Sequence, residues 1–409
     1  MAEDIEARRQ EVRALSELGM TELAKASAGV HQTHRAVSDA VFSLIRRGLG
    51  PATLPVKTLH DGITDGVYRI VEESTVAAGR VSGRVADLPL RRPVSSTTRG
   101  AVLIAAINGV IGDELDGRQS PLTQHNLSIR VAGNHVPVTS ADLARAFPRA
   151  NRRIAVFVHG LTETEHAWRL RQRTTAPYEH RLWANGVTSV FLRYNTGRRI
   201  STNGQDLAEL LDDLVRFWPT EVDDLALIGH SMGGLVLRSA THHGRAADHL
   251  WTQRVRTSVS LGTPHLGAPM ENLAHHASAL LTMRAETEPF GRLLRRRSGG
   301  IRDLRAGSLV DHDWQGRDPD DLAAAFAAEV PLLPGAEHYF VSATISRDPQ
   351  DRLSRTLGDG LVLHHSAGGR SSTRNIGFPP NNGLHIGRAH HFSLLNHRVI
   401  GDHLAAWIG

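Results

Sequence analysis

A serine lies between glycines in the stretch Leu225 to Leu237, which reads L-A-L-I-G-H-S-M-G-G-L-V-L. The G-x-S-x-G pattern at Ser231 follows an apolar run typical of a strand and precedes a run typical of a helix. A tight strand-to-helix turn exposes the serine hydroxyl above the sheet, where it can attack a carbonyl carbon. Glycine-rich turns with an idle serine match the bare motif as well, so the prediction that Ser231 is a nucleophile depends on the strand and helix around it.

A second motif, His159-Gly160, follows the apolar run Ile154 to Val158. A nucleophilic serine needs N–H donors that are aimed at the oxyanion of the tetrahedral intermediate. We expect one donor from the backbone of Met232, directly after the serine, and the other from Leu161, in the loop after the second strand. Gly160 lets that loop approach closely, and we expect His159 to support the loop rather than to transfer protons.

Short apolar runs alternate with helical patterns from about residue 127 onward, and Asp206 to Phe217 is one such helical pattern. This alternation predicts βαβ units, and therefore an α/β fold with a doubly wound, mostly parallel sheet. Residues 128–131 and 135–138 flank a turn-like run and predict a hairpin. The apolar runs expected as strands are Ile154 to Val158, Ser189 to Leu192, Leu225 to Ile228, Thr257 to Leu261 and His338 to Thr344.

The chain resembles the lipase-like branch of the α/β-hydrolase superfamily, and it is similar to bacterial triacylglycerol lipases and to the hydrolase domain of GPI inositol-deacylases. The resemblance covers about residues 150 to 409 and implies an ester hydrolase with a helical lid, here roughly residues 270–328. The four blocks that carry it appear in the family's order and are Val156 to Leu161, Gly229 to Gly234, the G-T-P-H-L-G-A-P block from Gly262 to Pro269, and Gly358 to Val362 followed by His391 to Leu395.

The serine also needs an imidazole base and a carboxylate that orients the imidazole. α/β-Hydrolases supply these groups in the order serine, acid, histidine, and the resemblance implies Ser231, Asp359 and His391 in that order. Asp359 matches the family's Gly-Asp-Gly block, while Asp348 lies closer to the end of the preceding strand and is the alternative. His391 matches a histidine followed two residues later by Leu-Leu, and its neighbour His390 is the alternative. We expect a helix to begin near Leu394.

These residues predict cleavage of carboxylic esters through an acyl-enzyme, with an acyl ester or lipid as substrate. Acyl transfer by the same triad and a non-catalytic binding or scaffold role are the competing hypotheses. No cofactor or metal is expected, because the chain has no cysteine and no H-E-x-x-H motif. Glu163 to His166 is interpreted as loop and helix start, and Arg193 to Arg198 either lines the substrate pocket or is a plain loop.

The composition is that of a globular protein, with 40% hydrophobic and 22% charged residues among 409. The net charge is +5, and Lys25 and Lys57 are the only lysines. The arginine clusters have no interleaved aromatic residues, so no nucleic-acid partner is expected. The acidic start lacks a secretory pattern, and the apolar stretch Ala101 to Gly112 is shorter than the roughly twenty residues of a membrane span. The sequence therefore predicts a cytoplasmic protein.

Residues 1–125 differ from residues 126–409, which we expect to form the catalytic domain. Helical spacing of apolar residues predicts amphipathic helices over Ala36 to Ile45, from Ile63 to Val71, and over Thr98 to Leu115. Three roles fit this N-terminal region: self-association, a second cap, or peripheral membrane binding. The apolar and basic run Val41 to Arg47 suits a membrane surface, although packing onto the catalytic domain is the simpler expectation.

Overall fold

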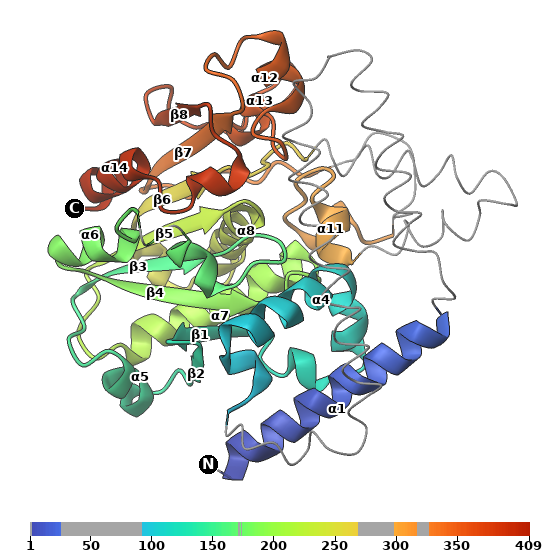
Figure 1. The fold of residues 1–409 in the computed structure, drawn as a ribbon. Helices are drawn as coiled ribbons and strands as arrows, with labels where there is room; N and C mark the ends of the chain where they lie inside the picture. The colour runs from blue at the N-terminus through green and yellow to red at the C-terminus, as the bar shows by residue number, and fades with distance from the viewer. Residues whose placement is uncertain (1, 26–91, 171, 173, 269–297, 317–326) are drawn as a thin grey trace, which may run out of the picture.

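The structure of the protein is a computed structural model that describes residues 2–25, 92–170, 172, 174–268, 298–316 and 327–409. Its centre is an eight-stranded sheet in the order β2-β1-β4-β3-β5-β6-β7-β8 (Figure 1). The strands are β1 (Leu127–Val131), β2 (Asn134–Val136), β3 (Arg153–Val158), β4 (Val187–Tyr194), β5 (Asp224–His230), β6 (Val255–Leu261), β7 (Glu337–Thr344) and β8 (Gly383–Gly387).

Strands β3 to β8 run parallel to one another, while β1 pairs antiparallel with both β2 and β4. The predicted hairpin is confirmed as β1 and β2, joined through Ala132 and Gly133, which both have positive φ. Each apolar run expected as a strand lies in the sheet, and the predicted α/β class is confirmed. Because the parallel strands end at one edge, the loops after β3, β5, β6 and β7 meet there.

Helices cover both faces of the sheet, and alternate residues of a strand reach opposite cores. In β3, Val156 packs into the core formed with α7 and α8, whereas Phe157 packs into the core formed with α6 and α14. The helices are α1 (Ala2–Lys25), α4 (Thr98–Gly117), α5 (Ser140–Ala146), α6 (Tyr178–Ala184), α7 (Ile200–Phe217), α8 (Met232–Ala246), α11 (Gly299–Asp303), α12 (Arg352–Leu357), α13 (His364–Ala367) and α14 (Arg398–Ile408), with short 3-10 helices η2 (Val94–Ser96), η3 (Pro121–Thr123), η4 (Glu165–Arg169), η5 (Leu250–Arg254), η6 (Asp311–Asp313) and η7 (His391–Leu394).

The N-terminal part contains α1 and α4, which lie beside each other at the edge of the molecule (Figure 1). Helix α4 confirms the helix expected over Thr98 to Leu115, and α1 was not expected from the sequence. Leu15 and Leu18 of α1 pack against the apolar cluster that α4 forms with Leu122. Within the described ranges, no helix is both long and apolar enough to cross a membrane.

Several sequence predictions concern residues outside the described ranges. The helices expected over residues 36–45 and 63–71 lie there, as do residues 270–297 and 317–326 of the expected lid. The described part of that region, residues 298–316, contains α11 and η6. The boundary between residues 125 and 126 stays a prediction. Across it, Asn195, after β4, donates to the Gly112 carbonyl of α4 over 2.9 Å.

The helix expected near Leu394 begins later, at Arg398, so that prediction was wrong by one helical turn. Long-range hydrogen bonds hold the intervening chain in a non-helical form. The Tyr178 hydroxyl donates to the Leu394 carbonyl over 2.6 Å and accepts from the His397 amide over 2.9 Å. Asn396 has a φ of 55°, and its side chain bonds the backbone of Tyr178 and Leu170. These partners lie more than 200 residues away, so local periodicity carries no sign of them.

Candidate active site

Ser231 occupies the turn between β5 and α8 with φ 53° and ψ −124°. A non-glycine residue in so sparsely populated a region stores about 1–3 kcal/mol of strain. The Ser231 amide donates to the Leu261 carbonyl of the neighbouring strand over 2.8 Å, which holds the turn against β6. The glycines have the spatial role that the motif predicts. An added Cβ would lie 2.5 Å from the Gly234 nitrogen at Gly229, and 2.2 Å from the Val158 oxygen at Gly233.

Asp359 and His391 form a buried pair at the same edge of the sheet. The Nδ1 atom of His391 lies 2.8 Å from Oδ2 of Asp359, and both residues are 1% exposed. The other carboxylate oxygen of Asp359 accepts from the amides of Leu361 and Val362 over 2.9 and 2.8 Å. Since a carboxylate only accepts, Nδ1 of His391 carries the hydrogen of this bond, and the lone pair of the neutral ring is on Nε2.

The surroundings of His391 also determine its basicity. Burial by itself lowers the pKa of His391, but the negative charge of Asp359, its hydrogen bond and the more distant charge of Glu163 raise it. The net effect is a pKa above the ordinary value of 6.5. Such a histidine is well suited to accept a proton, because its cation is stabilised by the carboxylate behind it.

The His391 ring lies beside the chain that carries Ser231. Its ring centroid is 4.7 Å from that of His230, the residue directly before the serine. A Cβ added to Gly262, the residue after Leu261, would lie 3.1 Å from Cε1 of His391. The ring therefore packs over the end of β6, next to the strand that leads into the serine turn.

The turn Gly160 to Glu163, after β3, lies against the serine. A Cβ added to Gly160 would lie 3.0 Å from Cβ of Ser231, so this glycine permits the close approach. Among the described residues, the amides of Leu161 and Met232 donate no hydrogen bond to a protein acceptor. Backbone amides without a protein acceptor are the kind of donor that an oxyanion hole uses.

His159 supports this turn, as expected. Its Nδ1 donates to the Gly160 carbonyl over 2.9 Å, and its Nε2 accepts from the Tyr194 amide over 3.3 Å. Burial lowers the pKa of His159 to about 4, so the ring is neutral at physiological pH. With both nitrogens engaged, His159 is a structural residue.

The alternatives for the acid and the base lie elsewhere. Asp348 is exposed, and its carboxylate accepts from the Gln350 amide over 2.8 Å. His390 precedes η7 as its N-cap residue, and its amide donates to the Ser393 hydroxyl over 3.2 Å. The structure therefore brings together Asp359 and His391.

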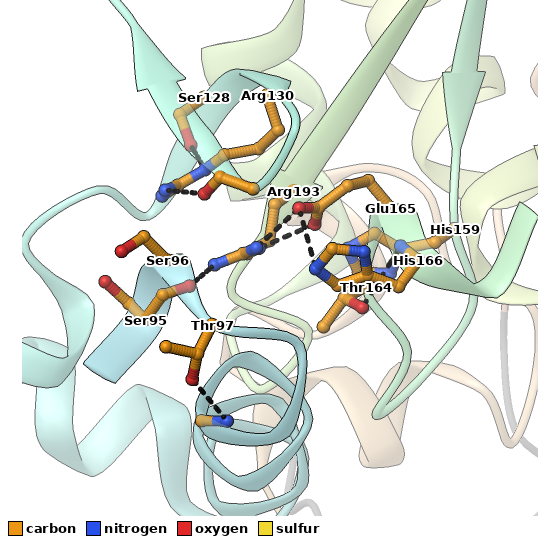
Figure 2. Close-up of polar contacts among 12 residues, drawn as sticks. Ser95, Ser96, Thr97, Ser128, Arg130, His159, Thr164, Glu165, His166 and Arg193 are labelled. Atoms are coloured by element: carbon orange, nitrogen blue, oxygen red, sulfur yellow. Dashed lines mark hydrogen bonds and ion pairs between the residues drawn. The ribbon is translucent and has the colours of Figure 1, made fainter. Parts of the chain in front are cut away.

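The end of β4 is held by structural contacts. Figure 2 shows the Arg193 guanidinium between the Glu165 carboxylate and the Ser95 carbonyl. The Arg193 and Glu165 side chains are only 10% and 7% exposed, and their shortest contact is 2.5 Å. As interpreted from the sequence, Glu165 begins η4, with Thr164 as its N-cap. No group of three or more potential metal ligands occurs in the part of the chain that the structure describes.

Two residues of the site were missed by the sequence reasoning, namely Glu163 and His230. His230 stands inside the G-H-S-M-G motif, and Glu163 follows His159-Gly160 by three residues. Their side chains meet, with 3.0 Å between Nδ1 of His230 and the carboxylate. The one available signal was their adjacency to the two recognised motifs.

The mostly parallel sheet, with a serine on the turn after β5 and an acid and a histidine on later loops, is that of an α/β-hydrolase. Residues 150–291 match the family model described as the PGAP1-like alpha/beta domain, within the part of the chain for which the motifs gave the resemblance. No curated protein sequence matches the chain significantly.

Solved structures similar to this chain include bacterial and archaeal lipases and esterases. The mature lipase of Bacillus licheniformis is 20% identical, covers 64% of this chain and 93% of its own, and has a TM-score of 0.41. A metagenomic carboxyl esterase is 14% identical over an alignment that covers 63% of this chain and 76% of the esterase, with a TM-score of 0.37. An esterase of Pyrococcus furiosus is 13% identical over an alignment that covers 63% of this chain and 83% of the esterase, with a TM-score of 0.35.

Proposed function

We propose that the protein is a serine hydrolase that cleaves carboxylic esters, with Ser231 as nucleophile, His391 as general base and Asp359 as its carboxylate partner. The observation that carries this proposal is the buried Asp359–His391 pair beside the strained turn of Ser231. Nothing in simple packing requires a positive φ at a serine, and such strain is typical of functional sites.

In the proposed mechanism, Nε2 of His391 takes the Ser231 proton as the hydroxyl oxygen attacks the ester carbonyl. The oxyanion accepts hydrogen bonds from the amides of Leu161 and Met232, each of which contributes about 3 kcal/mol to lowering the barrier. The protonated His391 then donates its proton to the leaving alcohol. Water hydrolyses the acyl-enzyme by the same route, and this regenerates the serine.

Hydrolysis of short p-nitrophenyl acyl esters tests the proposal. The purified protein should release p-nitrophenol with saturation kinetics and react with a fluorophosphonate probe, and Ser231→Ala should lose nearly all of both activities. Equal turnover by the Ser231→Ala protein would refute the assignment of the nucleophile. A native protein that neither turns over esters nor labels would instead support the binding or scaffold hypothesis.

The physiological reaction needs two further measurements. A panel of esters with increasing acyl length identifies the preferred substrate, which we propose to be an acyl ester or lipid. Product analysis with added alcohol acceptors separates hydrolysis from acyl transfer, because transfer yields a new ester at the expense of the free acid.

Sedimentation of the full chain with liposomes tests the proposed membrane-binding role of residues 1–125. The mass of the chain in solution tests the proposed self-association role.

A further inference from the structure

A second carboxylate–imidazole pair lies beside the proposed triad and has no step in the mechanism above. Glu163 and His230 come from the loop after β3 and from the last residue of β5. Their side chains are 9% and 0% exposed, and Nδ1 of His230 lies 3.0 Å from each carboxylate oxygen. Burial raises the pKa of Glu163, but the charge of His230 and two hydrogen bonds outweigh burial and leave the pKa below its usual value. Glu163 is therefore a carboxylate.

Glu163 closes the turn that carries Leu161. Its carboxylate accepts from the Gly160 amide over 2.7 Å, and its own amide donates to the Gly160 carbonyl over 3.2 Å. The residues between are Leu161 and Thr162, and Thr162 has a φ of 59°. A turn closed from both ends has few alternative conformations, so the direction of the Leu161 amide is determined.

His230 ties this closed turn to the rest of the site. The Glu163 carboxylate only accepts, so Nδ1 of His230 carries the hydrogen of their bond. Its Nε2 lies 3.4 Å from the backbone oxygen of His391. The ring is further enclosed by Trp168, whose ring centroid is 6.3 Å away in an edge-on arrangement. The pair thus joins the turn after β3, the strand that leads into Ser231, and the segment of His391.

We propose that Glu163 and His230 are positioning residues that hold the Leu161 amide on the oxyanion side of Ser231. The inference rests on the proposed esterase function. The carboxylate binds the backbone amide of Gly160, one residue before the proposed donor, so it acts directly on the turn that carries Leu161. A buried carboxylate often contributes little net stability even when it has a partner, so precise placement of the turn is the stronger physical reason for this one.

Steady-state kinetics of Glu163→Ala and Glu163→Gln test the proposal. Removing one oxyanion donor typically lowers kcat by 10²–10³-fold, so we expect Glu163→Ala to lower kcat by about 100-fold with KM within twofold. The glutamine oxygen can still accept from the Gly160 amide, so Glu163→Gln should recover part of that loss. Phosphonylation by a fluorophosphonate should slow in parallel, because its transition state places an oxygen in the same hole.

Glu165→Gln is the matched control. Glu165 is similarly buried two residues further along, but its carboxylate bonds Arg193 and, among the described residues, makes no hydrogen bond to residues 160–163. We expect its kcat to stay within threefold of the native value even if its melting temperature falls. Native kcat in folded Glu163→Ala, or an equal loss of kcat in both variants at equal loss of stability, would overturn the positioning role.

A readout without turnover separates this inference from the esterase function. In the Ser231→Ala protein, ¹⁵N NMR should show a proton on Nδ1 of His230. The Leu161 amide resonance should shift in the double variant that carries both Ser231→Ala and Glu163→Gln. An unprotonated Nδ1 of His230, or a Leu161 resonance that does not shift, would refute the positioning role of the pair. If the native protein shows no esterase activity but both NMR observations are as expected, only the proposed function is refuted.

Discussion

Asparagine at position 359 should invert the hydrogen-bonding of the His391 imidazole, the proposed general base. One carboxylate oxygen of Asp359 accepts from the amides of Leu361 and Val362, and the other accepts from His391. In Asp359→Asn the amide oxygen must remain at the first position, because two N–H donors face it there. The NH₂ group then faces Nδ1 of His391 and donates to it. His391 is forced into the tautomer with its hydrogen on Nε2, and this nitrogen can no longer take the serine proton.

The size of the effect follows from this geometry. Both partners are 1% exposed, so solvent neither screens the wrong contact nor replaces it. A buried asparagine that imposes the wrong tautomer on a triad histidine elsewhere lowers kcat by about 10⁴-fold. This factor corresponds to about 5.5 kcal/mol of barrier, at 1.36 kcal/mol for each tenfold change.

The assay is hydrolysis of a p-nitrophenyl ester by the native, Asp359→Asn and Asp348→Asn proteins, with thermal unfolding of each as the check on folding. Asp348 is exposed and lies outside the pair, so Asp348→Asn should keep native kcat. A folded Asp359→Asn protein with kcat within tenfold of native would refute the tautomer argument. Loss of activity in Asp348→Asn would transfer the acidic role to that residue.

Two further outcomes follow from the site. Because the pKa of His391 is raised above 6.5 and the base must be neutral, kcat/KM should rise with pH through a midpoint above 6.5; a pH-rate profile with its midpoint below 6 would contradict the electrostatic role of Asp359. A Cβ at Gly233 would lie 2.2 Å from the Val158 oxygen, whereas one at Gly117 would meet nothing within 4 Å. Urea unfolding should therefore show Gly233→Ala destabilised by about 3 kcal/mol and Gly117→Ala nearly unchanged, and equal midpoints would refute the tight contact between α8 and β3.

The sequence predicted the features that depend on neighbours along the chain. Alternation of apolar runs located the parallel strands, and the glycines around Ser231 predicted a turn that the structure builds with a positive φ. Both follow from local sterics and periodicity, which a short window of residues contains. The order of the strands in the sheet does not depend on such windows, and no order was predicted.

Tertiary structure decided between residues of the same type. His390 and His391 are neighbours in the sequence, and the structure places the second against Asp359, 32 positions away. Tyr178, bound to residues 394 and 397, delays the start of α14 against the local helical pattern. Glu163 and His230 meet because β3 and β5 pair in parallel and end together. Contacts between distant segments carry no local periodicity, so only the folded chain reveals them.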